Sequence, residues 1–311
     1  EVPEGMFRVG IVSDPTRDMG ALGPAECDRI VAALDLAEAR GLPVEWIPVS
    51  AGARIAMDSG TENLDATARV VRRIVTFTQG GGTIHVVVGG VNVGAQSYWD
   101  ALATMQSSCR GALIMTPSGS MVLTGRAALE AAGSVAAEDE IAIGGYERVA
   151  GPNGEAHYFA RDLAEASGIL HRYYRFSYVV PGELAPRALA TADRMDRDIR
   201  ATAYTGEDPD FSLVGDLFDE KKNPGRKKPF AMRELMSATA DIDTEPLERW
   251  RDWEGAETAI VWDTSLGGKP VCLLGIESRN VPRVGHRPLD GPAEWTGGTL
   301  FPHSSRKVAR A

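Results

Sequence analysis

Cysteine is scarce in this chain of 311 residues. Its three cysteines, Cys27, Cys109 and Cys272, are about 80 and 160 residues apart and form no CxxC pair. That spacing is poor material for a disulfide framework or a zinc site. We therefore expect reduced thiols with structural roles and no metal site.

Basic residues and long apolar runs are also in short supply. Lysine and arginine number 33 against 43 aspartates and glutamates, which gives a formal net charge of -10. A nucleic-acid partner would need a concentrated basic face against that overall field, and the sequence shows none. No apolar run approaches the roughly 18 to 20 residues of a membrane span, and the first six residues lack a signal-peptide layout. The sequence predicts a cytoplasmic protein without a membrane partner.

The remaining composition, 43% hydrophobic and 24% charged, is typical of a globular protein. Helical spacing predicts a helix over residues 24–40 that ends at Gly41, and another over residues 64–79 with Leu64, Ala68, Val71 and Val75 on its apolar face. Strands are predicted at residues 7–12, 44–49, 84–88, 112–115 and 120–123, with further helices from residue 95, over 125–132 and over 161–174. This alternation favours an α/β fold with largely parallel strand pairing.

The later part of the chain has a different pattern. Residues 192–258 are acidic and irregular with several aromatic anchors, and a second α/β unit begins at residue 259. Residues 304–311 look like a helix start without a stop signal. We expect three segments, 1–191, 192–258 and 259–311, in a piece of a longer protein.

Two turns of small residues follow predicted buried strands, at residues 50–55 and 89–94. Small residues let a ligand approach the backbone, and amides in such turns can point outward as donors. Two donors on a thioester oxygen would form an oxyanion hole for an enolate. Tight packing explains a single turn of this kind equally well.

The run Ser50-Ala51-Gly52-Ala53-Arg54-Ile55 resembles the Ser-Gly-Gly-Ala-Arg-Ile signature of biotin-dependent carboxyltransferases and departs from it at Ala51. The residues after it extend the resemblance in order and rough spacing: 91–95 resembles the second oxyanion turn, 123–125 the strand-to-helix step, 143–145 the element beside the coenzyme, and 275–279 the opening of a second domain.

The resemblance implies a crotonase-like ββα superhelix whose first domain is essentially complete and whose second domain is truncated. It implies transfer of a carboxyl group from carboxybiotin to the α-carbon of acetyl-CoA or propionyl-CoA. Biotin would arrive on a partner, and the expected partners are biotin carboxyl carrier and biotin carboxylase components or domains, with a homodimer for the longer protein. The fragment alone would then have an incomplete site.

Carried over by position, the resemblance implies amide donors to the thioester oxygen at Ala53, Val93 and Gly94. It implies that Arg54 and Arg279 hold the transferred carboxylate, a task that suits a permanently charged fork. Ser50 and Gly52 would belong to the same substrate-binding turn. Gly144 and Gly145 would allow close approach of the acyl or pantetheine portion.

Other interpretations remain open. Arg54 could instead form an ion pair at a strand end, and the chain could be a biotin-dependent acyl-CoA decarboxylase or a non-catalytic acyl-CoA-binding fragment. A crotonase-like hydratase or isomerase would need an acidic residue near the second turn, and the nearest is Asp100. His85 and His157 lack partner spacing, which favours hydrogen-bonded structural roles.

Overall fold

The computed structural model describes residues 5–54, 61–105, 110–133, 138–208 and 210–311. The chain forms two compact units, Gly5–Leu170 and His171–Ala311, called here the N-terminal and C-terminal units. The division falls within helix α6 (Leu163–Ser177). The segment limits expected at residues 191 and 258 stay predictions.

A five-stranded parallel sheet forms the centre of the N-terminal unit. Its order is β1 (Val9–Val12), β2 (Val44–Ile47), β3 (Ile84–Val88), β5 (Leu113–Met115) and β7 (Tyr158–Phe159). Every residue of β3 is buried, which is typical of a parallel strand covered on both faces. The predicted α/β fold with parallel pairing is confirmed.

A second, smaller ladder lies in the same unit. Strands β4 (Val91–Val93) and β6 (Ser120–Val122) pair in parallel, and isolated bridges join Ser50 to Asn92 and Ser120 to Gly145. After each of β2, β3 and β5 the chain leaves the main sheet and enters this ladder. The arrangement brings residues that follow β2 next to residues that follow β3.

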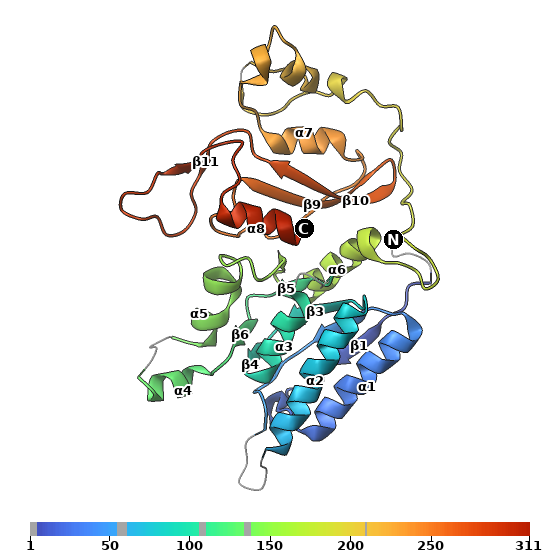
Figure 1. Cartoon of the computed structure of the whole chain (residues 1–311), viewed down its shortest axis with the longest axis vertical. Helices are drawn as coiled ribbons and strands as arrows, with labels where there is room; N and C mark the ends of the chain where they lie inside the picture. The colour runs from blue at the N-terminus through green and yellow to red at the C-terminus, as the bar shows by residue number, and fades with distance from the viewer. Residues whose placement is uncertain (1–4, 55–60, 106–109, 134–137, 209) are drawn as a thin grey trace. The chain divides into compact units, whose positions relative to one another are not determined.

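Three helices lie side by side along the main sheet: α1 (Pro24–Arg40), α2 (Glu62–Gln79) and α3 (Ala95–Thr104) (Figure 1). Helix α1 begins where the Glu26 carboxylate accepts the Gly23 N–H at 3.0 Å. It ends at Gly41, which adopts the left-handed conformation that favours glycine in this position. Local signals therefore set both ends of α1, as the sequence predicted.

The buried face of α2 differs from the expected one. Ala66, Val70, Ile74 and Phe77 are buried, whereas Leu64 is 62% exposed. The predicted apolar face was right in part, because Val71 and Val75 are partly buried against the core, whereas Leu64 and Ala68 are exposed. Helix α2 packs against both α1 and α3, so its buried side is set by these neighbours. The rings of Trp46 and Trp99, 5.9 Å apart, fill the same core.

Short elements complete the N-terminal unit, and their bounds are α4 (Arg126–Ala131), α5 (Glu140–Gly144) and the π-helical turn η2 (Tyr146–Ala150). A 3-10 turn, η1 (Asp18–Gly20), lies between β1 and α1. Helix α5 begins at Asp139, whose carboxylate accepts the Ala142 N–H at 2.9 Å.

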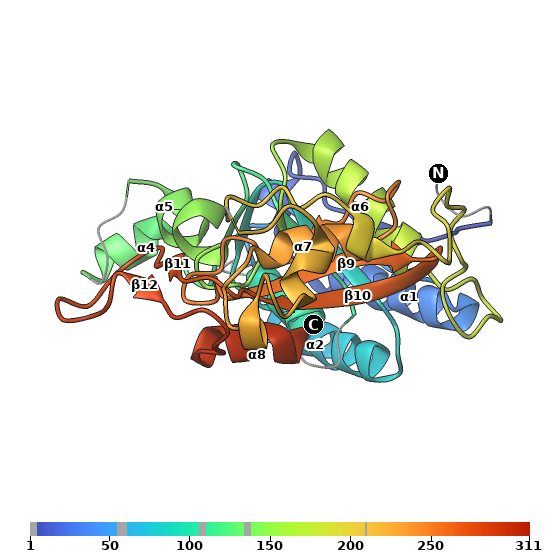
Figure 2. The same cartoon turned by 90° about the horizontal axis from the view of Figure 1, so that it is seen from above.

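The C-terminal unit contains an antiparallel sheet of β10 (Lys269–Ile276), β9 (Ala259–Leu266) and β8 (Leu247–Glu248). Strands β9 and β10 run side by side in both views (Figure 1, Figure 2). Gly267 and Gly268 form their turn with φ of 56° and 76°, and the Asp241 carboxylate accepts both amides at 2.6 and 2.8 Å. The positive φ values explain why the turn contains two glycines.

The remaining elements of this unit are α7 (Met232–Thr239), α8 (Pro302–Arg310), the short strands β11 (Val281–Pro282) and β12 (Glu294–Trp295), and the 3-10 turns η3 (Ile199–Ala201), η4 (Val214–Phe218) and η5 (Pro224–Arg226). The described residues of the expected irregular segment thus include the regular helix α7 and the short strand β8. Within the described ranges, no helix is both long and apolar enough to cross a membrane.

Candidate functional site

The turn from Ser50 to Arg54 begins three residues after β2. The Ser50 hydroxyl donates to the Gly20 carbonyl at 2.8 Å and accepts the Gly52 N–H at 3.0 Å. Gly52 has φ of +90°, a conformation that residues with a Cβ rarely adopt. One buried hydroxyl therefore fixes the shape of the turn. Ile55, the last residue of the signature, lies outside the described residues.

The turn from Val91 to Ala95 contacts the first turn at two glycines. A Cβ on Gly52 would lie 3.0 Å from the Val93 carbonyl oxygen and 3.9 Å from the Gly94 Cα. A Cβ on Gly94 would lie 3.9 Å from the Gly52 Cα. The two turns that the sequence singled out are therefore neighbours, and glycine at both positions permits their close contact.

The amides of these turns differ in their hydrogen bonds. The Val93 N–H donates to the Ser50 carbonyl and the Gly94 N–H donates to the Val122 carbonyl, each at 2.8 Å. Both amides are therefore committed to the small ladder. Among the described residues, the Ala53 and Ala95 amides meet no acceptor.

Geometry explains why these two amides stay open. Leu22 bonds to both neighbours of Ala53, because its N–H donates to the Gly52 carbonyl and its carbonyl accepts the Arg54 N–H, each at 2.8 Å. In a parallel ladder the residue between two such bonds directs its own N–H away from that partner. Ala95 is the first residue of α3, where helical amides have no partner within the helix.

Arg54 forms an ion pair with Asp18, and both side chains are about half exposed or more. Asp18 and Met19 have φ of 47° and 52°, which is a strained conformation for residues that carry a Cβ. The Met19 carbonyl accepts the Ala51 N–H at 3.0 Å. The strained 3-10 turn is thus attached to the Ser50–Arg54 turn through Asp18 and Met19. The ion pair that the sequence left open for Arg54 is present.

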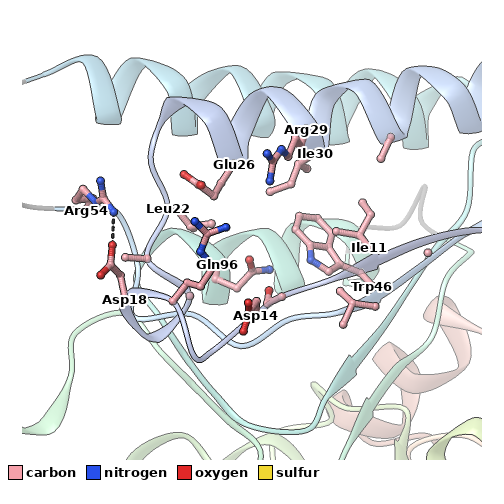
Figure 3. Close-up of a pocket in the computed structure, with 17 residues that line it drawn as sticks. Ile11, Asp14, Asp18, Leu22, Glu26, Arg29, Ile30, Trp46, Arg54 and Gln96 are labelled. Carbon is pink, nitrogen blue, oxygen red and sulfur yellow. Dashed lines mark hydrogen bonds and ion pairs between the residues drawn. The ribbon is translucent and has the colours of Figure 1, made fainter.

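A cavity of about 590 Å³ lies in the N-terminal unit, with Arg54 in its lining (Figure 3). Its charged side chains are three arginines and three carboxylates: Arg17, Arg29, Arg54, Asp14, Asp18 and Glu26. Within the described residues, neither Arg17 nor Arg29 forms an ion pair. Trp46 and Ile11 add apolar surface. The cavity therefore offers two unpaired cations beside the Ser50–Arg54 turn.

A fully buried polar cluster lies directly behind the second turn. The Asp100 carboxylate accepts a hydrogen bond from the Asn92 side-chain amide at 2.7 Å and another from the Gln96 side-chain amide at 2.8 Å. All three residues are buried completely. Burial raises the pKa of Asp100 to about 7, although the two amide hydrogen bonds oppose that shift.

The family of the chain follows from a comparison with known protein families. Residues 4–311 match the family described as the carboxyl transferase domain. The chain belongs to this carboxyl transferase family. The resemblance found in the Ser50–Arg54 run is therefore confirmed at the level of the family.

Named relatives of this carboxyl transferase domain are carboxylases. The propionyl-CoA carboxylase beta chain of Rhodococcus erythropolis is 32% identical over 202 residues, which cover 64% of this chain and 38% of the relative. Acetyl-CoA carboxylase of Dictyostelium discoideum is 24% identical over 374 residues, which cover 100% of this chain and 16% of the relative. The chain spans less than half the length of these relatives.

A solved structure shares the fold. It is the crystal structure of transcarboxylase 12S, a hexamer with hydrolysed methylmalonyl-coenzyme A bound. The likeness has a TM-score of 0.66 at 19% identity, and it covers 85% of this chain and 45% of the other. At that identity the likeness concerns the fold alone.

The remaining predicted site glycines of the carboxyl transferase domain lie where α5 meets β6. A Cβ on Gly144 would lie 2.4 Å from the Met121 carbonyl oxygen and 2.5 Å from Val122 Cγ1. The Gly145 N–H donates to the Ile141 carbonyl at 2.8 Å. The chain's own atoms therefore fill the space beside Gly144, and packing accounts for glycine there.

Arg279, the second predicted carboxylate ligand, lies in the C-terminal unit. Its backbone N–H donates to the Glu277 carboxylate at 3.2 Å, and its guanidinium is 4.0 Å from the same oxygen. Arg54 lies in the other compact unit. A shared task for the two arginines stays a prediction.

The sequence also singled out two histidines and the cysteines. His85 and His157 each accept a backbone amide at 3.1 Å through Nδ1, from Ala112 and Leu113 respectively. Burial lowers the pKa of His85 to about 3. Both histidines are thus hydrogen-bonded structural residues, as predicted.

Cys27 and Cys272 are free thiols, and burial raises the pKa of Cys27 to about 11. Cys109 lies outside the described residues. In the described part of the chain, no group of three or more metal-binding side chains is found.

Sequence reasoning missed three features of this site: Asp18 as the partner of Arg54, the open Ala95 amide, and Asp100 as the centre of a buried cluster. The four-residue spacing of Gln96 and Asp100 signals a contact on one helix face. The turn at Asp18 has a weaker signal, because aspartate adopts positive φ more often than most residues, whereas Met19, which also has positive φ, belongs to a type that rarely does.

Proposed function

We propose that this chain is the acyl-CoA side of a biotin-dependent carboxyltransferase. In this reaction a carboxyl group moves from carboxybiotin to the α-carbon of acetyl-CoA or propionyl-CoA. The observation that carries the proposal is the pair of open amides, Ala53 and Ala95, on two touching turns of a carboxyl transferase domain. In this proposal the domain has a crotonase-like fold and the chain is part of a longer protein.

The open amides would bind the thioester oxygen. Loss of the α-proton turns the thioester into an enolate, and negative charge develops on that oxygen. Two backbone donors held by the fold stabilise such a charge without reorganisation, and each is worth about 3–4 kcal/mol in comparable sites. The donor role expected for Val93 and Gly94 moves to Ala95 in this proposal, because the first two amides already bond within the small ladder.

Charged residues would hold the two substrates. Arg54 can exchange its exposed partner Asp18 for the carboxylate that is transferred, since surface ion pairs contribute only about 0–1 kcal/mol. Arg279 would be the second ligand of that carboxylate. The unpaired guanidiniums of Arg17 and Arg29 in the cavity suit the phosphates of coenzyme A.

Partners follow from the same proposal. Carboxybiotin would be delivered by a biotin carboxyl carrier after its formation by a biotin carboxylase, and the longer protein would form a homodimer in the cytoplasm. Ser50 and Gly52 would shape the substrate turn. The substrate contact that the resemblance implies for Gly144 and Gly145 is left out of the proposal, because β6 fills the space beside Gly144. Fatty acid biosynthesis through malonyl-CoA is the corresponding role when acetyl-CoA is the acceptor.

Two alternatives keep the same site. A decarboxylase would run the transfer from a malonyl-type thioester to biotin, and a non-catalytic fragment would bind acyl-CoA without transfer. A hydratase or isomerase is disfavoured because Asp100, its candidate acid, is completely buried and hydrogen-bonded to Asn92 and Gln96.

The test uses the full protein that contains this chain. Transfer of carboxyl from malonyl-CoA and from methylmalonyl-CoA to free biotin is measured, with Arg54→Ala beside the wild type. We expect transfer in the wild type and a 10- to 100-fold lower kcat/KM in the variant, because a charged hydrogen bond to the carboxylate is lost.

Arg69→Ala is the matched control, because it removes an exposed arginine that pairs with Asp28 on the neighbouring helix. It is expected to keep wild-type kinetics. Acyl-CoA binding without any carboxyl transfer would favour the non-catalytic alternative and overturn the proposal. The ratio of transfer from the two thioesters then gives the acyl preference.

A further inference from the structure

Asp100 occupies an unusual position for a carboxyl group. It lies in the second turn of α3 (Ala95–Thr104) and is completely buried. No cation of the described residues pairs with it; its hydrogen-bond donors are the side-chain amides of Asn92 and Gln96. A buried carboxyl without a cation is costly compared with a packed apolar residue. Its presence therefore calls for a role beyond filling the core.

The two donors flank the second turn. Asn92 is in β4, before Val93 and Gly94, and it is bridged to Ser50 of the first turn. Gln96 follows Ala95 at the start of α3. Asp100 therefore ties the strand that enters the turn to the helix that leaves it. The open Ala95 amide lies between the two tied residues.

We propose that Asp100 is a positioning residue that fixes the direction of the Ala95 N–H by holding Asn92 and Gln96 together. The inference rests on the proposed function, in which this amide binds the thioester oxygen. Asp100 itself touches no substrate, since it is absent from the cavity lining and has no exposed surface. Its effect passes through the hydrogen bonds at 2.7 and 2.8 Å.

The cluster also contains two spare acceptors. Within the described residues, Asn92 Oδ1 and Gln96 Oε1 are buried and receive no hydrogen bond. If Asp100 became asparagine, rotation of one neighbouring amide by 180° would present its oxygen to the new NH₂ group, and the other amide would still donate to the asparagine oxygen. Asparagine can therefore keep both connections, whereas leucine at the same position can keep neither.

The experiment compares Asp100→Asn with Asp100→Leu in the full protein, and carboxyl transfer from malonyl-CoA to free biotin gives kcat and KM. We expect Asp100→Leu to lower kcat about 100-fold with KM changed less than about 3-fold, since a displaced catalytic donor costs rate on this scale. Asp100→Asn is expected to stay within about 3-fold of the wild type. Asp28→Asn, which changes an exposed carboxylate of α1, is the control.

Distinct outcomes overturn distinct claims. If the wild type transfers no carboxyl group, the proposed function fails and takes the inference with it. If the wild type is active and folded Asp100→Leu keeps its kcat, the positioning role is wrong. If Asp100→Asn is as slow as Asp100→Leu, the carboxyl group itself is required and positioning is again wrong.

A further variant covers a failure of Asp100→Leu to fold. Gln96→Met removes one of the two connections and keeps an unbranched side chain of similar length. We expect it to lower kcat about 10-fold through the same displacement. A folded Gln96→Met protein with wild-type kcat would overturn the inference.

Discussion

Two pairs of glycines in the N-terminal unit use the absence of a side chain in opposite ways. Gly52 and Gly94 bring two turns together, and the residue after each of them has an amide without an acceptor among the described residues. At Gly144 the space of a side chain is filled by β6, and the Gly145 amide is used within α5. Small residues therefore mark places where two segments of the chain approach closely. Whether a ligand can bind there depends on whether the nearby backbone amides are already hydrogen-bonded within the chain.

The largest expected effect comes from removing the open amide of Ala95, the residue that follows Gly94 of the first pair. Ala95→Pro removes the N–H at the first helical position, where proline is well tolerated. We expect kcat for carboxyl transfer to fall about 10²- to 10³-fold, the effect of removing one oxyanion donor. Steady-state kinetics on the full protein measures it.

Ala95→Ser is the control for that change, because it retains the N–H and alters only the side chain. It is expected to keep kcat within a few-fold of the wild type. Equal kcat values for the proline and serine variants would mean that the Ala95 amide does not bind the developing charge.

A smaller effect concerns Asp100, the completely buried acid behind the Val91–Ala95 turn of the first pair. The pKa of Asp100 is raised to about 7, so the folded state favours its protonated form. Stability from this group is present below the unfolded pKa of about 3.9 and is lost as the pH rises through about 7. Relative to Asp100→Asn, the wild type should lose about 2–3 kcal/mol of unfolding free energy between pH 5 and pH 8.

Urea unfolding at both pH values measures this difference. The comparison cancels His85, whose pKa is lowered to about 3 and whose contribution to stability is lost as the pH falls. Parallel pH dependences for the wild type and Asp100→Asn would show that Asp100 titrates near its ordinary pKa.

Local signals explain how much of the fold the sequence could predict. Pro24 and Gly41 bound α1, and strand–helix alternation gave the parallel sheet, because both depend on neighbouring residues. The buried face of α2 was predicted only in part, since Val71 and Val75 pack against the core but Leu64 does not, because contacts with α1 and α3 determine that face. Features that depend on residues close together in the sequence could be predicted, whereas features that depend on contacts between distant segments could not.

The same reason limits prediction of the candidate site. The motif located the Ser50–Arg54 turn and its contact with Val93 and Gly94. It could not reveal that these two amides bond to Ser50 and Val122, which come from other segments. Which amide is open is therefore a tertiary property.

The smallest expected effect comes from a substitution in the second glycine pair, Gly144 and Gly145. Gly144→Ala places a Cβ 2.4 Å from the Met121 carbonyl oxygen and 2.5 Å from Val122 Cγ1, and the backbone oxygen of β6 cannot move aside as a flexible side chain would. Such overpacking costs about 1–3 kcal/mol of unfolding free energy, which chemical denaturation measures. Gly168→Ala in α6 is the matched control, because its Cβ meets nothing within 4 Å.

Alanine at that helical position should stabilise the protein by about 0.5–1 kcal/mol, so the two substitutions are expected to have opposite signs. Activity per folded molecule separates packing from ligand contact at Gly144. If Gly144→Ala retains wild-type stability but loses acyl-CoA affinity, the space beside Gly144 belongs to the substrate. The two glycine pairs would then serve one site instead of two different purposes.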